Sequence, residues 1–374
     1  MLRQGTTTYT AKALAETVAS MGGEVNTSVG MDASFVGMSV LSEFGDDAVG
    51  LIADMVMNAK FEANDLARIK TDTERRLSVA LSNPSSIANE AFYHSVYGNH
   101  PYGRLYPTSE SLKALSVENT ANFVKTHIVP NRSHLYVSGV FDKSSIANAV
   151  ESAFSQWEKG QPIERKTVLT KSGPSFELLE REDAPQSTLR LGLATLAPAH
   201  EDYMKMSLMN TLLGGAFASR ITSNIREDKG YTYSPRSAMV DRVGTGVWYE
   251  AADVTAESTG AALDEIIKEI DLLATEAPTT EELEGIKNYM AGIFVLRNSS
   301  RTAIISQLAF TELHGLDESY LADYVKTIYA ITPEEIKAVT AKYLDVNKMH
   351  LTIVGDTESV MPQLKEVEAL KPFM

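Results

Sequence analysis

One stretch decides the fold because the chain carries it twice: Asn131–Gly139 reads NRSHLYVSG and, 216 residues later, Asn347–Gly355 reads NKMHLTIVG. In both copies an apolar run ends at a glycine, which is typical of a buried strand followed by a turn. A helical pattern precedes each copy in the same register, and Ser116 and Thr332 stand where a helix N-cap is expected. Each unit is therefore predicted to form a capped helix, a short turn, a buried strand and a glycine.

A second block of matches lies upstream, where Leu66 and Ile69 correspond to Leu283 and Ile286 at an offset of 217. Two blocks in nearly the same register indicate an internal duplication. Strands next to long helices indicate the α+β class, so we expect two similar domains, each a largely antiparallel sheet with helices packed on one face. The expected strands are 24–29, 32–41, 188–196, 233–240 and 246–253, and the expected helices are 11–21, 46–59, 62–81, 85–97, 219–228, 258–274, 280–296 and 301–314.

The two predicted domains are joined by a polar segment, residues 158–173, in which Gly160 and Pro162 lie among basic residues. This composition predicts a linker. The first domain is then 1–157 and the second 174–374. A helical pattern starts almost directly after Met1, which leads us to expect further sequence upstream.

Composition excludes several classes of function. The net charge of −15 disfavours nucleic-acid binding, which needs a basic face to neutralise phosphates. The chain has no cysteine, so disulfide bonds, thiolate metal sites and a cysteine nucleophile are excluded. No apolar run reaches the roughly 18 residues that a membrane-spanning helix needs.

Two motifs resemble those of a known family. The stretch Leu212–Arg220 (LLGGAFASR), followed by Ile225–Tyr233 (IREDKGYTY), closely resembles the signature of the second domain of the insulinase/pitrilysin and mitochondrial processing peptidase family. Gly98–Arg104 (GNHPYGR) resembles a motif of that family's first domain. The opening residues 1–6 and Met21–Gly23 look like the segment that follows the family's metal motif. The resemblance covers nearly the whole chain.

The resemblance implies a zinc site that this sequence does not match. The family's motif is H-x-x-E-H on a helix, in which two imidazoles bind zinc and the glutamate activates water. None of the seven histidines belongs to such a motif. The family's third ligand, a glutamate, pairs with Arg76 here, and a guanidinium cannot ligate zinc. Glu74 is the nearest acid, but it lies on a nearly opposite helix face.

The family includes paired systems in which one subunit has lost the zinc motif. Met31–Ser34 and the arginine-rich end of the helix that starts at Glu62 resemble that zinc-less type. The resemblance then implies a non-catalytic subunit with no catalytic residue, no metal ligand and no cofactor of its own. Zinc is expected in a catalytic family member that pairs with it as a heterodimer, although a homodimer remains open. The two would enclose a chamber in which a peptide binds by adding a strand to a sheet edge.

Arg226 and Tyr233 are the candidate substrate-binding residues, because family members carry an arginine and a tyrosine there that bind the peptide across from zinc. A guanidinium and a phenol can both donate to a peptide carbonyl. The alternative is that both residues are structural, with Arg226 in a salt bridge at a helix end and Tyr233 packed on a sheet. Gly214, Gly215, Ser219 and Arg220 are expected to be structural, with the glycines allowing either a close helix-to-sheet approach or a tight turn and Ser219 serving as an N-cap.

Two other functions stay open. The chain could be an active zinc endopeptidase whose H-x-x-E-H motif lies upstream of Met1, or a structural scaffold subunit like some family members in respiratory complexes. A metal cluster of Glu90, His94 and His100 is disfavoured against surface or capping roles, and His134 and His350 occupy equivalent positions in the repeat, which suggests structural roles. The export of bacterial relatives favours a periplasmic location.

Overall fold

The structure, a computed structural model, describes residues 1–163 and 165–374. Two compact units make up this part of the chain. The first comprises residues 1–78, 107–166 and 301–309, and the second comprises residues 79–106, 167–300 and 310–374. The units therefore interleave along the sequence: residues 79–106, which belong to the first copy of the repeat, group with the second unit. No helix among the described residues is long and apolar enough to cross a bilayer.

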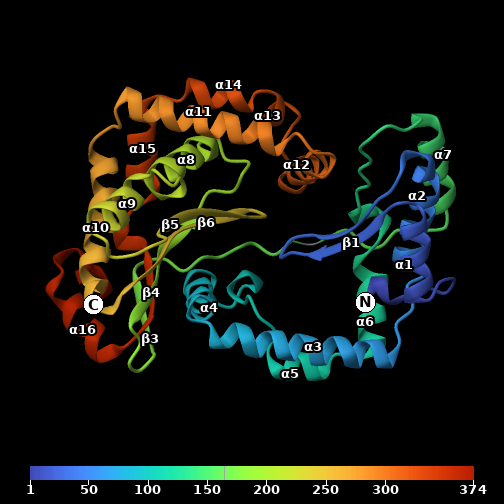
Figure 1. Ribbon diagram of the computed structural model, residues 1–374, viewed down its shortest axis with the longest axis horizontal. Helices are drawn as coiled ribbons and strands as arrows, with labels where there is room; N and C mark the ends of the chain where they lie inside the picture. The colour runs from blue at the N-terminus through green and yellow to red at the C-terminus, as the bar shows by residue number, and fades with distance from the viewer. Residues whose placement is uncertain (164) are drawn as a thin grey trace. The chain divides into compact units, whose positions relative to one another are not determined.

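The first unit is built on a hairpin of two antiparallel strands, β1 (Glu24–Val29) and β2 (Ser34–Ser39) (Figure 1). Its small core consists of Leu14, Val18, Leu51 and Met55 from two helices, with side chains of the hairpin packed against them. The helices are α1 (Ala11–Ser20), α2 (Gly45–Met57), α3 (Ala63–Ser82, which continues into the second unit), α5 (Ser109–Ala114), α6 (Val117–His127) and α7 (Lys143–Phe154).

The second unit contains a five-stranded sheet in the order β3-β7-β4-β6-β5. All neighbouring strands are antiparallel except β3 and β7, which are parallel. The strands are β3 (Ser175–Glu180), β4 (Gln186–Thr195), β5 (Arg236–Arg242), β6 (Thr245–Thr255) and β7 (His350–Gly355). The expected strands 188–196, 233–240 and 246–253 correspond to β4, β5 and β6, whereas β3 was not predicted.

Both faces of this sheet are covered. Alternate side chains, such as Leu191 on β4 and Trp248 on β6, join one large core with α8 (Tyr203–Asn210), α10 (Thr259–Thr275) and α15 (Pro333–Tyr343). On the other face, Phe92 and Tyr97 of α4 (Pro84–Tyr97) pack with Val247. In Figure 1, β5 and β6 lie between α8 and α4. The remaining helices of the second unit are α11 (Thr280–Arg297), α13 (Ser319–Ala322), α14 (Tyr324–Ala330) and α16 (Thr357–Glu366). Helix α12 (Arg301–His314) begins in the first unit and ends in the second.

The two copies of the repeat share their helix starts but not their strands. Ser116 and Thr332 are both helix N-caps, as predicted, and each also forms a capping box with the third residue of the helix that follows. The copy at 347–355 contains β7, which is buried and hydrogen-bonded to β3 and β4. The predicted strand within 131–139 is wrong: residues 133–138 form no ladder, and Leu135 and Val137 are exposed. A strand needs neighbours to satisfy its backbone groups, and no described strand pairs with this copy.

Gly214 allows the segment after α8 to lie directly on the sheet. A Cβ atom built at this position would lie 2.7 Å from Ser237 Oγ on β5 and 2.8 Å from Glu250 Oε2 on β6. Both distances are shorter than real carbon contacts, and both neighbours are buried. The expected close helix-to-sheet approach is confirmed at this glycine.

Replacing Gly214 by alanine should destabilise the protein by about 1–3 kcal/mol, because the added methyl group overpacks the space above β5 and β6. Chemical denaturation at neutral pH measures the change. Gly285, in the middle of α11 with no atom near its Cβ position, provides the control: Gly285→Ala should leave stability unchanged or raise it. Equal effects of the two substitutions would contradict the close approach at Gly214.

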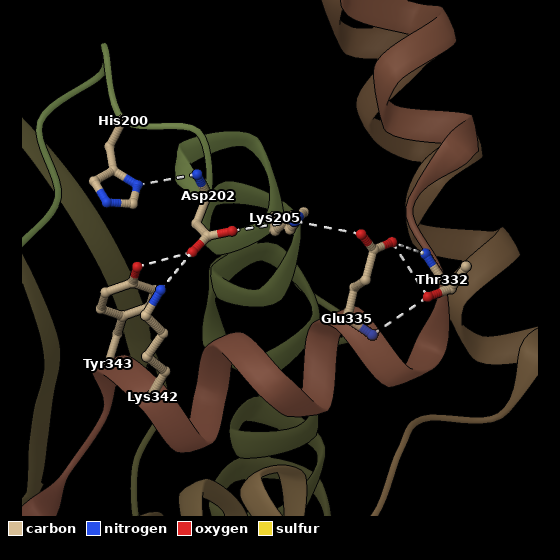
Figure 2. A network of polar contacts seen from close by, with 7 residues as sticks. All are labelled: His200, Asp202, Lys205, Thr332, Glu335, Lys342 and Tyr343. Carbon is tan, nitrogen blue, oxygen red and sulfur yellow. Dashed lines mark hydrogen bonds and ion pairs between the residues drawn. The ribbon is translucent and has the colours of Figure 1, made fainter.

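A polar network around Asp202 ties α8 to α15 (Figure 2). Asp202 Oδ1 lies 3.1 Å from Lys205 Nζ, and Oδ2 accepts hydrogen bonds from Lys342 Nζ at 3.0 Å and Tyr343 Oη at 2.8 Å. Lys205 also pairs with Glu335, whose other oxygen accepts from the backbone N–H of Thr332 at 2.9 Å. The hydrogen bond from Lys342 is the largest of the effects that hold the pKa of Asp202 far below its ordinary value.

Asp202→Asn should lower the free energy of unfolding by about 2 kcal/mol at pH 7, since two charge-assisted contacts are lost at a side chain that is 12% exposed. Because the folded-state pKa is depressed, the contribution is present above the unfolded value near 3.8 and is lost as the pH falls toward the folded pKa. The difference between the unfolding free energies of the two proteins should therefore shrink as the pH is lowered from 4 to 2. Glu16→Gln, in an exposed ion pair on α1, should match the wild type throughout.

Candidate functional site

The residues singled out in the sequence lie on one connected segment of the second unit. After α8 the chain forms a π-helical turn, η5 (Thr211–Gly215), a single helical turn, α9 (Arg220–Thr222), and a second π-helical turn, η6 (Ser223–Asp228). The prediction of one continuous α-helix at 219–228 is thus wrong in detail, because the α-helical turn changes to a π-helical turn after Thr222. Gly230 then turns the chain with a φ of 68°, a conformation that glycine adopts without strain.

The guanidinium of Arg226 contacts two aromatic rings. Its Cζ atom is 4.4 Å from the centroid of the Phe217 ring and 4.8 Å from that of Tyr233. Nε of Arg226 forms an ion pair with Glu227 at 3.1 Å. Phe217 and Tyr233 are 72% and 81% exposed, whereas the Arg226 side chain is 21% exposed. The rings therefore shield the cation while they remain largely open to solvent.

The backbone before Tyr233 is fixed to the end of β6. Thr232 forms an antiparallel bridge with Val254, and its hydroxyl donates to the carbonyl oxygen of Asp253 at 2.6 Å. The N–H of Thr255 donates to the carbonyl oxygen of Tyr231 at 3.2 Å. Tyr233 thus projects from a restrained strand-like segment although its ring is exposed.

A hollow of about 350 Å³ opens beside Arg226 and Tyr233. The structure therefore brings the two predicted residues together at one concave surface. Its chemistry suits an extended polypeptide: the guanidinium and the phenol can donate to carbonyl oxygens, and the rings offer apolar contact. The lining residues are Gln186, Arg226, Glu227, Gly230, Tyr231, Thr232, Tyr233 and Thr255.

Arg220 and Ser219 have structural roles, as expected. Nε and one terminal nitrogen of Arg220 bind the two carboxylate oxygens of Glu282 on α11 at 2.7 and 2.8 Å. Ser219 stands at the N-cap position of α9, but its hydroxyl donates to Thr222 Oγ1 at 3.0 Å rather than accepting from the helix backbone. Ser219 is 1% exposed, so this hydroxyl is internal to the fold.

The histidines considered in the sequence are structural where the contacts are defined. Nδ1 of His100 accepts from the backbone N–H of Tyr102 at 3.2 Å, and Glu90 accepts from the N–H of Leu105 at 2.8 Å. His350 and its equivalent, His134, differ in environment. His350 is buried and lies 2.6 Å from Ser175 Oγ, and burial lowers the pKa of its imidazole. His134 stacks on Tyr136.

The position that the resemblance assigns to a third zinc ligand does not fit a metal. Arg76 on α3 forms an ion pair with Asp72 at 3.1 Å, and its side chain is 67% exposed. A paired guanidinium offers no lone pair to zinc. Within residues 1–163 and 165–374, no three histidine, aspartate or glutamate side chains are grouped so that they could hold a metal ion.

Phe217 belongs to the site but was not singled out from the sequence. The sequence shows only that an aromatic residue stands between Gly215 and Ser219. That its ring is exposed, while Ser219 is buried, is known from the structure. Its position nine residues before Arg226 gave no sign that the two side chains meet, because the intervening turns set that geometry.

Arg220→Ala and Arg226→Ala should differ in their effects on stability. The first should cost about 2–3 kcal/mol, because it leaves Glu282 without its bidentate partner. The second should cost no more than about 1 kcal/mol, because it removes cation–π contacts with two rings that are themselves largely exposed. Thermal and denaturant unfolding of both variants checks this, and a greater loss with Arg226→Ala would make that residue a structural one.

Comparison with known proteins supports the resemblance. A family model described as insulinase (peptidase family M16) matches residues 1–107, and one described as the peptidase M16 inactive domain matches residues 114–290. The chain is similar to an uncharacterized zinc protease, YmxG, of Bacillus subtilis, at 27% identity over 346 residues, 91% of this chain and 82% of that protein. An uncharacterized zinc protease of Rickettsia bellii is 28% identical over 343 residues, 91% of this chain and 79% of that protein.

Solved structures share the fold. A crystal structure described as the peptidase M16 inactive domain from Pseudomonas fluorescens aligns with a TM-score of 0.85 at 24% identity and covers 96% of this chain and 87% of that one. A protease from Helicobacter pylori aligns with a TM-score of 0.86 at 17% identity, over 94% of this chain and 87% of that one. With family models over both repeats and the signature segment folded as one site, the chain belongs to the insulinase family of peptidases, M16.

Proposed function

We propose that this protein is the non-catalytic subunit of a two-subunit zinc peptidase and that it binds the peptide substrate through Arg226 and Tyr233. The observation that carries the proposal is the guanidinium of Arg226, which contacts two exposed rings and lines the hollow. A cation that served only the fold would be expected to pair internally, as Arg220 does with Glu282. Arg226 instead pairs with Glu227, its neighbour in the sequence, contacts two exposed rings and lines the hollow.

The electrostatics of the site suit a polypeptide backbone. Peptide carbonyls are neutral acceptors, and a guanidinium that is partly shielded from water donates more strongly to them than an exposed one. Glu227 offsets part of the positive charge, which favours a neutral carbonyl over a free anion. The edge strand β5 pairs only with β6 in this sheet, so its outer backbone groups could align an extended chain.

Catalysis is assigned to a partner. Arg76 stands where the family would place an acidic ligand, so no reaction step is assigned to this chain's own metal. A zinc-bearing member of the same family would supply the metal, the water and the base. This chain would bind and orient the peptide in a shared chamber.

The names of the relatives favour a second candidate. The Bacillus subtilis and Rickettsia bellii proteins are both called zinc proteases, so an active zinc endopeptidase whose metal motif lies outside residues 1–374 is the alternative. It predicts one zinc per full-length protein and cleavage without a partner.

Binding of fluorescein-labelled casein, an unstructured polypeptide, tests the proposal. Wild-type protein should raise the fluorescence anisotropy, and Arg226→Lys should weaken the affinity roughly tenfold or more, because a lysine cannot keep the fork of donors beside the rings. Lys268→Arg, at an exposed residue of α10, should bind like the wild type. Zinc content and cleavage are measured on the same samples.

The outcomes separate the candidates. Casein binding without zinc or cleavage, together with cleavage after a zinc-bearing relative that co-purifies with the chain is added, supports the proposed role. Stoichiometric zinc and cleavage by this chain alone would replace it with the active peptidase. Absence of casein binding, alone or with the partner, would leave a scaffold role.

A further inference from the structure

We infer that Phe217 is a positioning residue, which together with Tyr233 holds the Arg226 guanidinium in a fixed orientation toward the hollow. The inference rests on the proposed function for its consequence, namely peptide affinity, but its structural part stands on the ring geometry alone. Phe217 does not line the hollow, and it meets Arg226 at a shorter distance, 4.4 Å, than Tyr233 does at 4.8 Å.

The turn that carries Phe217 is anchored on both sides. Ala216 and Ser219 are buried, at 8% and 1% exposure, whereas Phe217 between them is 72% exposed. The N–H of Ala216 donates to the carbonyl oxygen of Thr211 at 3.0 Å, and the N–H of Ser219 donates to that of Ala216 at 3.1 Å. Hydrogen bonds therefore restrain the backbone on both sides of Phe217, while its ring lies at the surface rather than in the core.

The ring of Phe217 adds no apolar burial that would account for its place. Large side chains contribute to stability by leaving water, and this one remains mostly in water. Its defined contact is with the cation, whose attraction to the face of an aromatic ring is electrostatic. The contact therefore acts on the placement of Arg226.

Two rings limit the directions in which Arg226 can donate. Its Nε is paired with Glu227 at 3.1 Å, and the rings of Phe217 and Tyr233 lie 4.4 and 4.8 Å from Cζ. Arg226 also lines the hollow, so the guanidinium that the rings restrain is one of the donors available there. Without one ring, the long side chain would regain rotamers, and it would have to lose that freedom again on binding a peptide.

The test compares Phe217→Ala, Phe217→Leu and Phe217→Tyr by two readouts. In protein labelled with ¹³C and ¹⁵N at arginine, the Arg226 side-chain signals are assigned by their loss in Arg226→Lys. Ring currents should shift these signals in the wild type, and Phe217→Ala should move them toward the values of an exposed arginine. Phe217→Tyr should restore them, whereas Phe217→Leu, which keeps apolar bulk but no ring, should not.

The second readout is affinity for fluorescein-labelled casein. Phe217→Ala should weaken it roughly two- to fivefold, the range expected for one exposed cation–π contact. In the Arg226→Lys background the same substitution should have a smaller effect, because the two residues act together. Tyr289→Ala, at a half-exposed aromatic residue of α11, should change neither readout.

Unchanged Arg226 signals in Phe217→Ala would overturn the inference, whether or not the affinity for casein changes. So would an equal loss of affinity in the wild-type and Arg226→Lys backgrounds, which would mean that Phe217 contacts the peptide independently. If the wild type binds no casein, the proposed function fails, but the arginine signals still decide whether Phe217 holds Arg226.

Discussion

The site depends on how closely the backbone at Gly214 lies to strands β5 and β6. A hydrogen atom in place of a side chain lets η5 rest against Ser237 and Glu250, two buried residues of the sheet. Only two residues separate Gly214 from Phe217, and two residues after Phe217 the chain is buried again at Ser219. The positions of Phe217 and of α9 are therefore set by a packing distance at one glycine, and Arg226 follows one and a half turns later.

Buried polar groups fix the same region from the other side. Asn210 Oδ1, at the end of α8, accepts hydrogen bonds from Ser237 Oγ at 2.8 Å and from Trp248 Nε1 at 2.9 Å. Such bonds are directional, so they define one arrangement of α8 on β5 and β6 where apolar packing alone would tolerate several. Glu250 lies beside them, and burial raises the pKa of its carboxyl well above the ordinary value, although the backbone N–H groups of Arg236 and Ala251 and the charge of Arg190 act in the opposite direction.

The duplicated sequence has not produced two equivalent units. The capping boxes of α6 and α15 are the same because four adjacent residues suffice to make them. The strands differ, since β7 is paired on both sides and residues 133–138 are not. The second unit also takes α4, from the first copy, onto the sheet face that its own helices leave uncovered. The well-formed sheet, and the site at its end, therefore belong to the second unit.

The sequence by itself determined the features that depend on neighbouring residues. Periodicity placed α12 at 301–314 and β1 at 24–29 without error, and residue chemistry was enough to see that Arg76 is no ligand for a metal. Arg226 and Tyr233 were found through a resemblance, not through any local rule. Only the tertiary structure decided that Phe217 joins them, that residues 131–139 form no strand, and that β3 pairs in parallel with β7. Each of these features depends on contacts between residues far apart or across irregular turns, where the hydrogen-bonding partner or facing ring is supplied by the fold and leaves no periodic trace in the chain.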